Sequence, residues 1–516
     1  MAFNRVEIKN PVGINKDLPP TELPPNVWTG GINVLFNNGK STKAKGHTKV
    51  FDPVTAPPYW AFPVINSGVA VWHYATATGI YRYFGQAHED VTRVASPYAM
   101  DVDIGWNGGL LNGLPVANNG VDVPQIMEQT DNKFKDLPNW DATLTARVIR
   151  PFKNYLIALN LTDATGDLPH SIQWSSPADP GFAPPSWDNT DPTQDAGQVS
   201  LADSIGRVID GLALQDQFII YKEDAVYSMR FIGGLPVFSF RKIFDDAGAI
   251  STNCAVEFQG QHFVVAIGDV YVHNGVSKKS IITQKMKEFL YTNINEEYAT
   301  RIHVAIDRPR SEIWINFPNK NSVAGECTTA LIWNYQEDTW SIRDLPGTYY
   351  TTAGVIDPNA VLSSDIWDNG TGSWNTDVTP WNDTSYNPAK QKIIMVSPTN
   401  TALYLVDETS LFDTSSFTAI LEKTGIDFED RRGIKYLNAV QPHIEGNGEI
   451  DVYVGAQMWQ DQGIEWKGPY TFTIGEDFKV DCRISGRLLS IRFEGDSESS
   501  WTLNGYSLEV DLAGED

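Results

Sequence analysis

Apolar and polar side chains alternate along much of this chain, and the alternation predicts β-strands. In the segment AVYSMRF, residues 225–231, every second position from Ala225 is apolar, whereas Ser228 and Arg230 fall on the opposite face. A repeat of two residues is the side-chain period of an extended strand. The sequence therefore favours a fold made mainly of β-strands.

One hairpin pattern recurs: an apolar run, a short polar or glycine turn, and a second strand with an aromatic residue. The steps from Tyr227 to Tyr271 and from Tyr271 to Trp314 are each about 45 residues, the length of a four-stranded propeller blade. We therefore predict an irregular β-propeller of about six blades, although hairpins of an unrelated β protein could give the same pattern. The hairpins cover residues 69–83, 155–174, 218–231, 263–275, 304–317 and 393–407, with Tyr81, Trp174, Tyr227, Tyr271, Trp314 and Tyr404 as their aromatic partners.

The pattern of apolar, polar and turn residues changes along the chain, and it predicts three structural regions. Residues 1–54 are expected to form an extended arm and a hairpin that turns at Asn38-Gly39, and residues 55–430 the propeller with its insertions. A short connecting helix is expected within residues 279–298, where Ile282, Met286, Phe289 and Leu290 share one helical face. Residues 431–516 are expected to form a β-sandwich-like domain, because longer alternating strands occur at 450–459, 487–495 and 501–512.

Composition narrows the class of protein. The chain is 41% hydrophobic and 11% aromatic, which excludes a disordered chain. A net charge of -25 repels phosphate, so tight wrapping of nucleic acid is not expected. No signal peptide and no run of about 18 apolar residues is present, so we expect synthesis in a cytosol and no membrane span. The cysteines Cys254, Cys327 and Cys482 lie far apart and are expected to be buried, reduced thiols.

Motifs of enzymes and metal sites are missing from the sequence, so we predict no catalytic, cofactor or metal site. There is no P-loop, GxSxG, HExxH, GxGxxG, EF-hand loop or CxxC. The histidines are scattered, and His262 and His273, which flank one hairpin, are expected to be hydrogen-bonded strand-edge residues. The loop 364–377 is rich in Asp, Asn and Gly and could hold calcium, but turn chemistry explains the same composition.

A glycosidase would need two carboxylates about 5–9 Å apart in a cleft. Asp245-Asp246 and Glu296-Glu297 are the visible candidate pairs. Neighbouring residues on a strand point to opposite faces, so turns or solvated surface explain these pairs better.

Positive charge is concentrated in one stretch only, which holds Lys40, Lys43, Lys45, His47 and Lys49. It could meet phosphate or an acidic partner. Because the rest of the chain is acidic, we interpret it as a subunit contact, with a solvated edge strand as the alternative.

Three segments together resemble the tail nozzle (tubular tail, or head-to-tail stabilisation) proteins of short-tailed bacteriophages. They are PPNVWTGGINVLFNNGKSTKAKGHTKVF at 24–51, IWDNGTGSWNTDVTPWNDTSYNPAKQKIIMVSP at 366–398, and RISGRLLSIRFEGDSESSWTLNGYSLEVDLAG at 483–514. The family's closing motif usually ends on a basic residue, whereas Glu515 and Asp516 follow here. This departure puts a contact of the terminal tail in doubt but not the fold.

The resemblance implies a structural virion protein of the tail, made in the host bacterial cytoplasm, with no enzymatic activity. It implies a homohexameric ring that contacts tail adaptor and portal-proximal proteins, with tail fibres or spikes as further partners, and a platform role for the C-terminal domain. Viral DNA would pass through the lumen without tight binding, and a gate would open on host contact. The residues expected at subunit contacts are Trp28, Lys40, Lys43, Lys45, Trp374 and Trp381, with blade core as the alternative for the tryptophans.

Two hypotheses from other classes stay open at this point. A propeller lectin or glycosidase that binds carbohydrate would be a soluble monomer with a ligand cleft. A host-side scaffold propeller would have a regular repeat and an exposed binding rim, whereas the blades expected here are irregular.

Overall fold

The fold is almost entirely β-structure. The computed structural model describes residues 4–66, 69–84, 87–191, 193–234, 236–356, 390–496 and 498–513. Within these ranges the helices are α1 (Lys287–Asn293) and the 3-10 turns η1 (Pro20–Glu22) and η2 (Glu296–Arg301). None of the helices in the described ranges is long and apolar enough to cross a membrane. The predicted mainly β fold with a propeller and a sandwich is confirmed.

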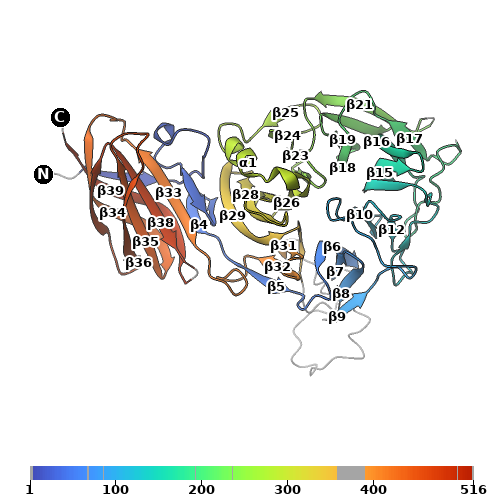
Figure 1. Ribbon diagram of the computed structural model, residues 1–516, viewed down its shortest axis with the longest axis horizontal. Helices are drawn as coiled ribbons and strands as arrows, with labels where there is room; N and C mark the ends of the chain where they lie inside the picture. The colour runs from blue at the N-terminus through green and yellow to red at the C-terminus, as the bar shows by residue number, and fades with distance from the viewer. Residues whose placement is uncertain are drawn as a thin grey trace, which may run out of the picture.

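Seven four-stranded antiparallel sheets form a ring, which occupies the right-hand part of Figure 1. In all but one pair of neighbouring blades, blades 1 and 2, the first strands contact each other around the axis, so the first strand is the inner strand of its blade. Blades 1 to 3 are β6 (Pro58–Asn66), β7 (Val69–Thr76), β8 (Ile80–Phe84) and β9 (Ala87–Asp90); β10 (Asn107–Leu111), β11 (Leu114–Asn118), β12 (Gln125–Ile126) and β13 (Lys135–Asp136); and β14 (Thr145–Phe152), β15 (Tyr155–Asp163), β16 (Gly166–Trp174) and β17 (Gly197–Ser200).

The other four blades follow in chain order, except for the last strand of the ring. Blades 4 to 6 are β18 (Val208–Leu214), β19 (Gln217–Lys222), β20 (Ala225–Phe231) and β21 (Phe238–Asp245); β22 (Ala255–Phe258), β23 (Gln261–Val265), β24 (Val270–His273) and β25 (Lys278–Ser280); and β26 (His303–Asp307), β27 (Glu312–Phe317), β28 (Cys327–Asn334) and β29 (Thr339–Thr348). Blade 7 is β30 (Tyr350–Val355), β31 (Gln391–Ser397), β32 (Ala402–Val406) and β5 (His47–Val50).

All six predicted hairpins are present, but the predicted count of about six blades is one too few. The missed blade is blade 2, residues 107–136. Its strands are two to five residues long and contain Gly108, Gly109 and Pro115, and they lack the aromatic residue that marks the other hairpins. Glycine and proline weaken the strand signal in a sequence, so this blade gives no recognisable pattern.

The ring is closed by a strand from the N-terminal region. β5 pairs antiparallel with β32, with His47 opposite Val406 and Val50 opposite Leu403. Figure 1 shows this blue strand beside the orange end of the propeller. The predicted boundary at residues 54/55 is therefore corrected, because the expected arm contains the outermost strand of blade 7.

A β-sandwich forms the other part of the molecule, and strands from both ends of the chain build it (Figure 1). The predicted hairpin at Asn38-Gly39 is confirmed as the turn between β3 and β4. The predicted boundary at 430/431 is corrected, since the sandwich also includes β33 and the N-terminal strands. One sheet holds β3 (Val34–Asn37), β4 (Lys40–Lys43), β39 (Ser500–Ala513), β34 (Ile434–Asn447) and β37 (Val480–Gly486), with β1 (Asn4–Lys9) on β39; the other holds β2 (Gly30–Ile32), β33 (Ala419–Ile426), β38 (Leu488–Gly495), β35 (Glu449–Gln457) and β36 (Glu465–Thr473).

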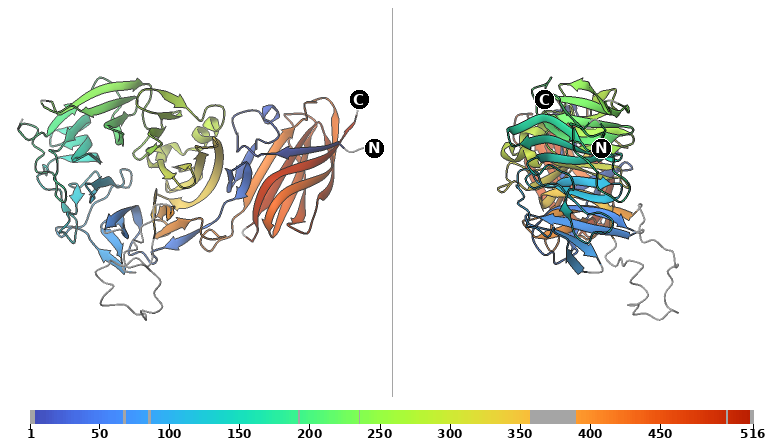
Figure 2. Two further views of the ribbon diagram at one scale, coloured as in Figure 1. Left: turned by 180° about the vertical axis from the view of Figure 1, so that it is seen from behind. Right: turned by 90° about the vertical axis from the view of Figure 1, so that its right-hand side faces the viewer.

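The propeller is thus an insertion between strands β4 and β33 of the sandwich. Figure 2 shows from behind that the two parts lie side by side, with both chain ends on the sandwich at the side away from the ring. Two chain segments cross between the parts, residues 44–46 and 407–418, and they bond to each other: Asp407 N donates to Gly46 O at 2.7 Å, and Gly46 N to Thr409 O at 2.7 Å.

A buried arginine of blade 6 holds both crossing segments. Arg343 on β29 has a fully buried side chain, which donates from Nη1 to Asp407 Oδ1 at 2.9 Å and from Nη2 to Lys45 O at 2.7 Å. Arg310 forms a second ion pair with Asp407. Since a buried charge is costly unless it is paired, these bonds fix the two crossings against the blade.

The helix predicted within residues 279–298 is shorter than expected. Its first residues form β25, and α1 covers Lys287–Asn293 only. Ile282, Met286 and Leu290 are fully buried, as the predicted apolar face requires. The first turn is capped by Asp17, whose carboxylate accepts from the backbone N–H groups of Lys287 and Glu288 at 2.7 and 3.1 Å.

Candidate binding site on the propeller axis

The inner strand of each blade has a paired neighbour on one side only, so its open edge faces the axis. A cavity of about 320 Å³ lies there, lined by residues of blades 3 to 7. Its apolar wall includes Leu212, Val256 and Ile306. The polar side chains around it are Arg150, Asp210, Asn253, Arg308, Tyr350, Thr351, Thr352 and Gln391.

Two charged residues that line this cavity, Arg150 and Asp210, form an ion pair between neighbouring blades. Arg150 on β14 donates from Nε to Asp210 Oδ1 at 2.8 Å and from Nη2 to Asp210 Oδ2 at 2.9 Å, which is a bidentate pair. Asp210 on β18 is 4% exposed and also accepts from the backbone N–H groups of Gly211 and Asn253, each at 2.8 Å. Four donors occupy the carboxylate, so Asp210 has no lone pair left for a substrate.

Arg150 also binds the blades on either side of the pair. Its Nη1 donates to Gly108 O of blade 2 at 3.0 Å, and its Nη2 donates to Asn253 Oδ1 before blade 5 at 2.6 Å. Arginine can only donate, so the oxygen of the Asn253 amide must face it. The pair and its partners therefore link blades 2, 3, 4 and 5 across the axis.

A histidine and a tyrosine stack on the blade 6 and blade 7 side of the axis. The ring centroids of His303 and Tyr350 are 5.8 Å apart, with 28° between the ring planes. His303 Nδ1 donates to Arg301 O at 3.0 Å, so its Nε2 accepts from Thr351 Oγ1 at 3.1 Å. Burial lowers the pKa of His303 to about 4 and raises the pKa of the Tyr350 phenol, so both groups stay neutral at physiological pH.

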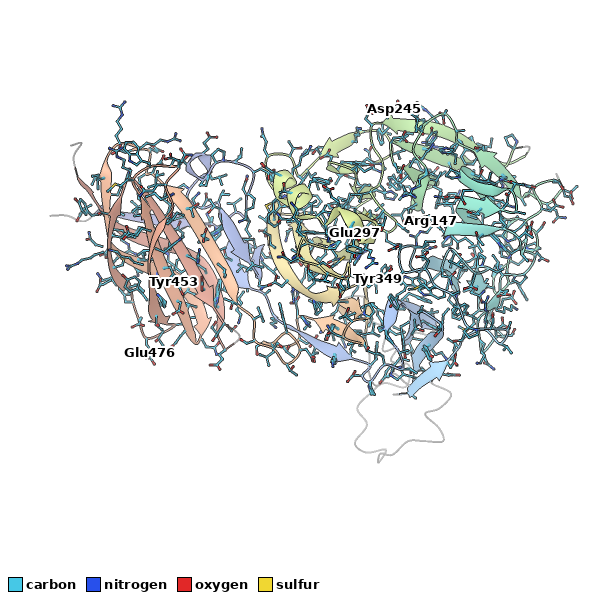
Figure 3. All side chains as sticks on the ribbon, in the orientation of Figure 1. Arg147, Asp245, Glu297, Tyr349, Tyr453 and Glu476 are labelled. Carbon is cyan, nitrogen blue, oxygen red and sulfur yellow. The ribbon has the colours of Figure 1, made fainter. Side chains whose placement is uncertain are left out.

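A second cavity, of about 30 Å³, shares Asn253 and Tyr350 with the first and opens toward the starts of the inner strands. Arg301 closes it: its Nη2 donates to Asp103 Oδ1 at 3.1 Å, and its guanidinium lies 5.6 Å from the centroid of the Tyr349 ring. Figure 3 shows Tyr349 near the middle of the propeller. The two cavities therefore meet at Asn253 and Tyr350, which line both of them.

The arrangement offers binding groups but little reactive chemistry. Among the described residues that line the larger cavity, Asp210 is the only carboxylate, whereas glycoside hydrolysis uses two. No group of three His, Cys, Asp or Glu side chains in the described ranges could hold a metal ion. What the cavity can do is bind a small polar molecule through amides, hydroxyls and Arg308.

Trp28 and Lys43, which the sequence indicated as subunit contacts, are buried inside the sandwich. Trp28 is 1% exposed and packs between Phe493 and Tyr506, with ring centroids 6.1 and 5.6 Å away. Lys43 is 7% exposed, and its Nζ donates to the backbone oxygens of Ser499, at 2.5 Å, and Asp496. Neither side chain is available to another subunit, because each fills the core or bonds within it.

The basic stretch around these residues does not form one patch. Lys40 lies 3.8 Å from Glu445, and the exposed Lys45 lies in the crossing segment 44–46. His47 is 1% exposed and stacks on Phe412 at 4.6 Å. Successive side chains of a strand point to opposite faces, so the basic residues of β4 and β5 do not all lie on one face of the molecule. The number of basic residues in the sequence does not reveal this. Trp374, Trp381 and the loop 364–377 lie outside the described residues.

The histidines singled out from the sequence form a buried network rather than a strand edge. His262 and His273 face each other across β23 and β24, and each binds Tyr221 Oη at 2.7 Å. His262 Nε2 donates to Ala213 O at 2.9 Å, and Gly275 N donates to His273 Nδ1 at 3.1 Å. These partners give a consistent chain in which Tyr221 donates to His262 Nδ1 and accepts from His273 Nε2.

The candidate carboxylate pairs lie on different parts of the propeller. Figure 3 shows Asp245 at the outer rim and Glu297 near the axis side of the ring. Asp245 is 74% exposed and pairs with Lys242 at 3.0 Å.

The three cysteines are buried and free, as predicted.

The axial residues were not predicted from the sequence, although the sequence holds a local signal for two of them. Arg150 ends the segment RVIR and Asp210 ends the segment RVID, and these segments lie on the inner strands of blades 3 and 4. A charged residue at matching places in two apolar runs indicates a pair that faces the axis. The other members, Asn253 and Gln391, follow no such pattern.

Comparison with known proteins gives no family. No family model and no curated protein matches the chain. The WD40 β-propeller domain of Doa1 is 9% identical, with a TM-score of 0.36, over 70% of this chain and 94% of that one. The extracellular domain of the BT3049 hybrid two-component system of B. thetaiotaomicron is 10% identical, with a TM-score of 0.43, over 86% of this chain and 54% of that one. At these values neither likeness bears on function.

Proposed function

We propose that this chain is a structural subunit of the nozzle ring in the tail of a short-tailed bacteriophage, and that it catalyses no reaction. The observation that carries the proposal is the architecture, a propeller that projects from a β-sandwich platform (Figures 1 and 2). The resemblance of the segments at 24–51, 366–398 and 483–514 to nozzle proteins implies the same two parts.

The state of the buried charges supports a structural role. Asp210 is saturated by four hydrogen bonds, and Arg343 and Arg310 both pair with Asp407. An enzyme needs polar groups that are free to act on a substrate, whereas these groups hold blades and crossings in place. The charges therefore serve the geometry of the subunit.

The net charge supports passage of DNA without adhesion. A chain with a charge of -25 gives a ring of several copies a strongly negative field, which repels phosphate. In the proposed assembly the genome passes through the centre of the ring of subunits. The axis of a single propeller cannot serve, because its larger cavity holds only about 320 Å³.

The test is quantitative mass spectrometry of purified virus particles from the source culture. The proposal expects this chain at about six copies per portal ring, because nozzle rings of this class are cyclic assemblies. The portal protein of the same particles provides the internal standard. If the chain is absent from particles, the proposal fails, and an array of glycans then tests the lectin alternative.

A further inference from the structure

The larger axial cavity has hydrogen-bonding capacity that the protein itself does not use. Asn253 Oδ1 accepts a hydrogen bond from Arg150, whereas Asn253 Nδ2 has no partner within the described residues. Thr352 lies on β30 and Gln391 on β31 of blade 7. Over the part of the chain that the structure describes, neither side chain forms a hydrogen bond. These groups come from the segment before blade 5 and from blade 7, and they line one cavity.

Arg308 adds a partly free guanidinium to the same cavity. It lies in the turn between β26 and β27, with 48% of its side chain exposed, and its Nη2 donates to Glu257 O and Oε2 at 3.0 and 2.9 Å. Among the described residues, its Nε and Nη1 have no partner. An arginine held by one nitrogen still presents two donor nitrogens, with three N–H groups, in a fixed plane.

The charged group of the cavity that remains free is a donor. Asp210 is the only carboxylate among the described lining residues, and its four hydrogen bonds leave no carboxylate lone pair open. The Asn253 Nδ2 and two nitrogens of Arg308 can only donate, whereas the Gln391 amide and the Thr352 hydroxyl can donate or accept. Such a set suits a ligand that carries negatively charged acceptor oxygens.

We propose that the axial cavity binds a small anion, a carboxylate or phosphate compound, between Arg308, Asn253, Thr352 and Gln391. The anion accepts hydrogen bonds from blades 5, 6 and 7 at once. It thereby joins the last two blades to the network of Arg150, which links blades 2 to 5. This inference does not depend on the proposed role in a tail.

The size and walls of the cavity fit this ligand class. A volume of about 320 Å³ accommodates a di- or tricarboxylate or a phosphorylated sugar, and the apolar wall of Leu212, Val256 and Ile306 can cover its carbon atoms. The Glu257 carboxylate pairs with Arg308 but is not part of the lining, so it orients the guanidinium without occupying the space.

Isothermal titration calorimetry of the full-length chain with citrate and with inorganic phosphate tests the proposal, at an ionic strength fixed with sodium chloride. Saturable binding of one anion is expected. The Arg308→Gln variant should bind at least about tenfold more weakly. The Thr352→Val variant, which loses a donor from the neighbouring blade 7, should also bind more weakly.

Arg207→Gln is the matched control, because Arg207 is similarly exposed and also pairs with a glutamate, at 2.8 Å, but does not line the cavity. It should bind as the original chain does. Circular dichroism establishes that each variant is folded. The proposal is overturned if neither anion gives a saturable heat, or if Arg308→Gln and Arg207→Gln bind equally, which would indicate a general surface effect.

Discussion

Glu312 is a buried carboxyl whose ionisation opposes folding. It is 4% exposed at the start of β27, and its Oε2 accepts from Trp314 Nε1 at 3.2 Å. Burial raises its pKa from 4.5 to about 7, against the opposing effect of the nearby Arg310. Since the folded pKa lies above the unfolded one, the stability is fully present below pH 4.5 and is lost as the pH rises through 7.

We expect the Glu312→Gln variant to remove this loss, because the amide stays neutral. The shift of about 2.5 pKa units corresponds to about 3 kcal/mol in the free energy of unfolding. Between pH 5.5 and 8.5, the original chain should lose about 2 kcal/mol more stability than the variant, measured by urea unfolding, because about a third of the effect is already lost between pH 4.5 and 5.5. Glu288→Gln, at an exposed position on α1, is the control and should leave the pH dependence unchanged. Equal pH dependence of Glu312→Gln and the original chain would refute the assignment.

The second prediction at the residue scale concerns the stability that the Tyr221 hydroxyl contributes. Its hydroxyl serves two buried imidazoles, and the pKa values of His262 and His273 are lowered by burial to about 4 and about 3, so the rings are neutral. Removal of the hydroxyl in Tyr221→Phe leaves one donor and one acceptor without partners, each at a cost of about 1–3 kcal/mol. We expect a loss of about 2–4 kcal/mol in chemical unfolding. Tyr436→Phe, at an exposed position, should change stability little; a similar loss in both variants would argue against the network.

At the scale of elements, the closing strand β5 depends on close contact between the two crossing segments. A Cβ atom on Gly46 would lie 1.7 Å from the backbone oxygen of Leu411, far inside van der Waals contact. Gly46→Ala should therefore separate the segments and weaken the pairing of β5 with β32, with a loss of about 3 kcal/mol or more.

Hydrogen exchange of the β5 amides measures this effect, since local opening speeds exchange. The control is Gly463→Ala in the turn between β35 and β36, where no atom lies within 4 Å of the added Cβ. Exchange in β5 should rise in Gly46→Ala and stay unchanged in Gly463→Ala. Unchanged exchange in both would show that the crossing segments do not hold the strand.

Elements were predictable from the sequence where the signal is local. Alternation and turn residues identified six hairpins and the strands of the sandwich, because strand period and turn chemistry act over a few residues. The pairing of β5 with β32 joins residues about 350 positions apart in the chain, and no local pattern encodes it. Lys43 and Trp28 were misassigned for the same reason, since their burial depends on β39 and β38 at the other end of the chain.

The residue types in the sequence were not sufficient to predict which side chains meet at the axial cavity. The RVIR and RVID segments suggest a pair between blades 3 and 4, but only the closed ring brings Asn253, Arg308 and Gln391 to the same cavity. A ring places seven inner strands side by side, so its axial chemistry is a property of tertiary structure.

At the scale of the whole molecule, the sandwich cannot form from the C-terminal region alone. β33 pairs with β2, and β39 pairs with β1 and β4, so both sheets need N-terminal strands. Lys423 on β33 is 1% exposed and donates to the backbone oxygens of Leu23 and Pro24 at 3.1 and 3.0 Å. Without the N-terminal segment this buried charge would lose its partners.

We therefore expect residues 419–516, expressed alone, to be unfolded, and residues 1–418 to be aggregation-prone because β2 and β4 present open edges. Co-expression of the two fragments should restore a one-to-one complex with the circular dichroism of the intact chain, because all sandwich pairings can then form. Size-exclusion chromatography with light scattering measures the complex. A dispersed amide spectrum from 419–516 alone would contradict the prediction and would mean that the sandwich core is independent of the N-terminal strands. Unfolding of the fragment alone and rescue by its partner would mean that the sandwich needs its N-terminal strands in order to fold.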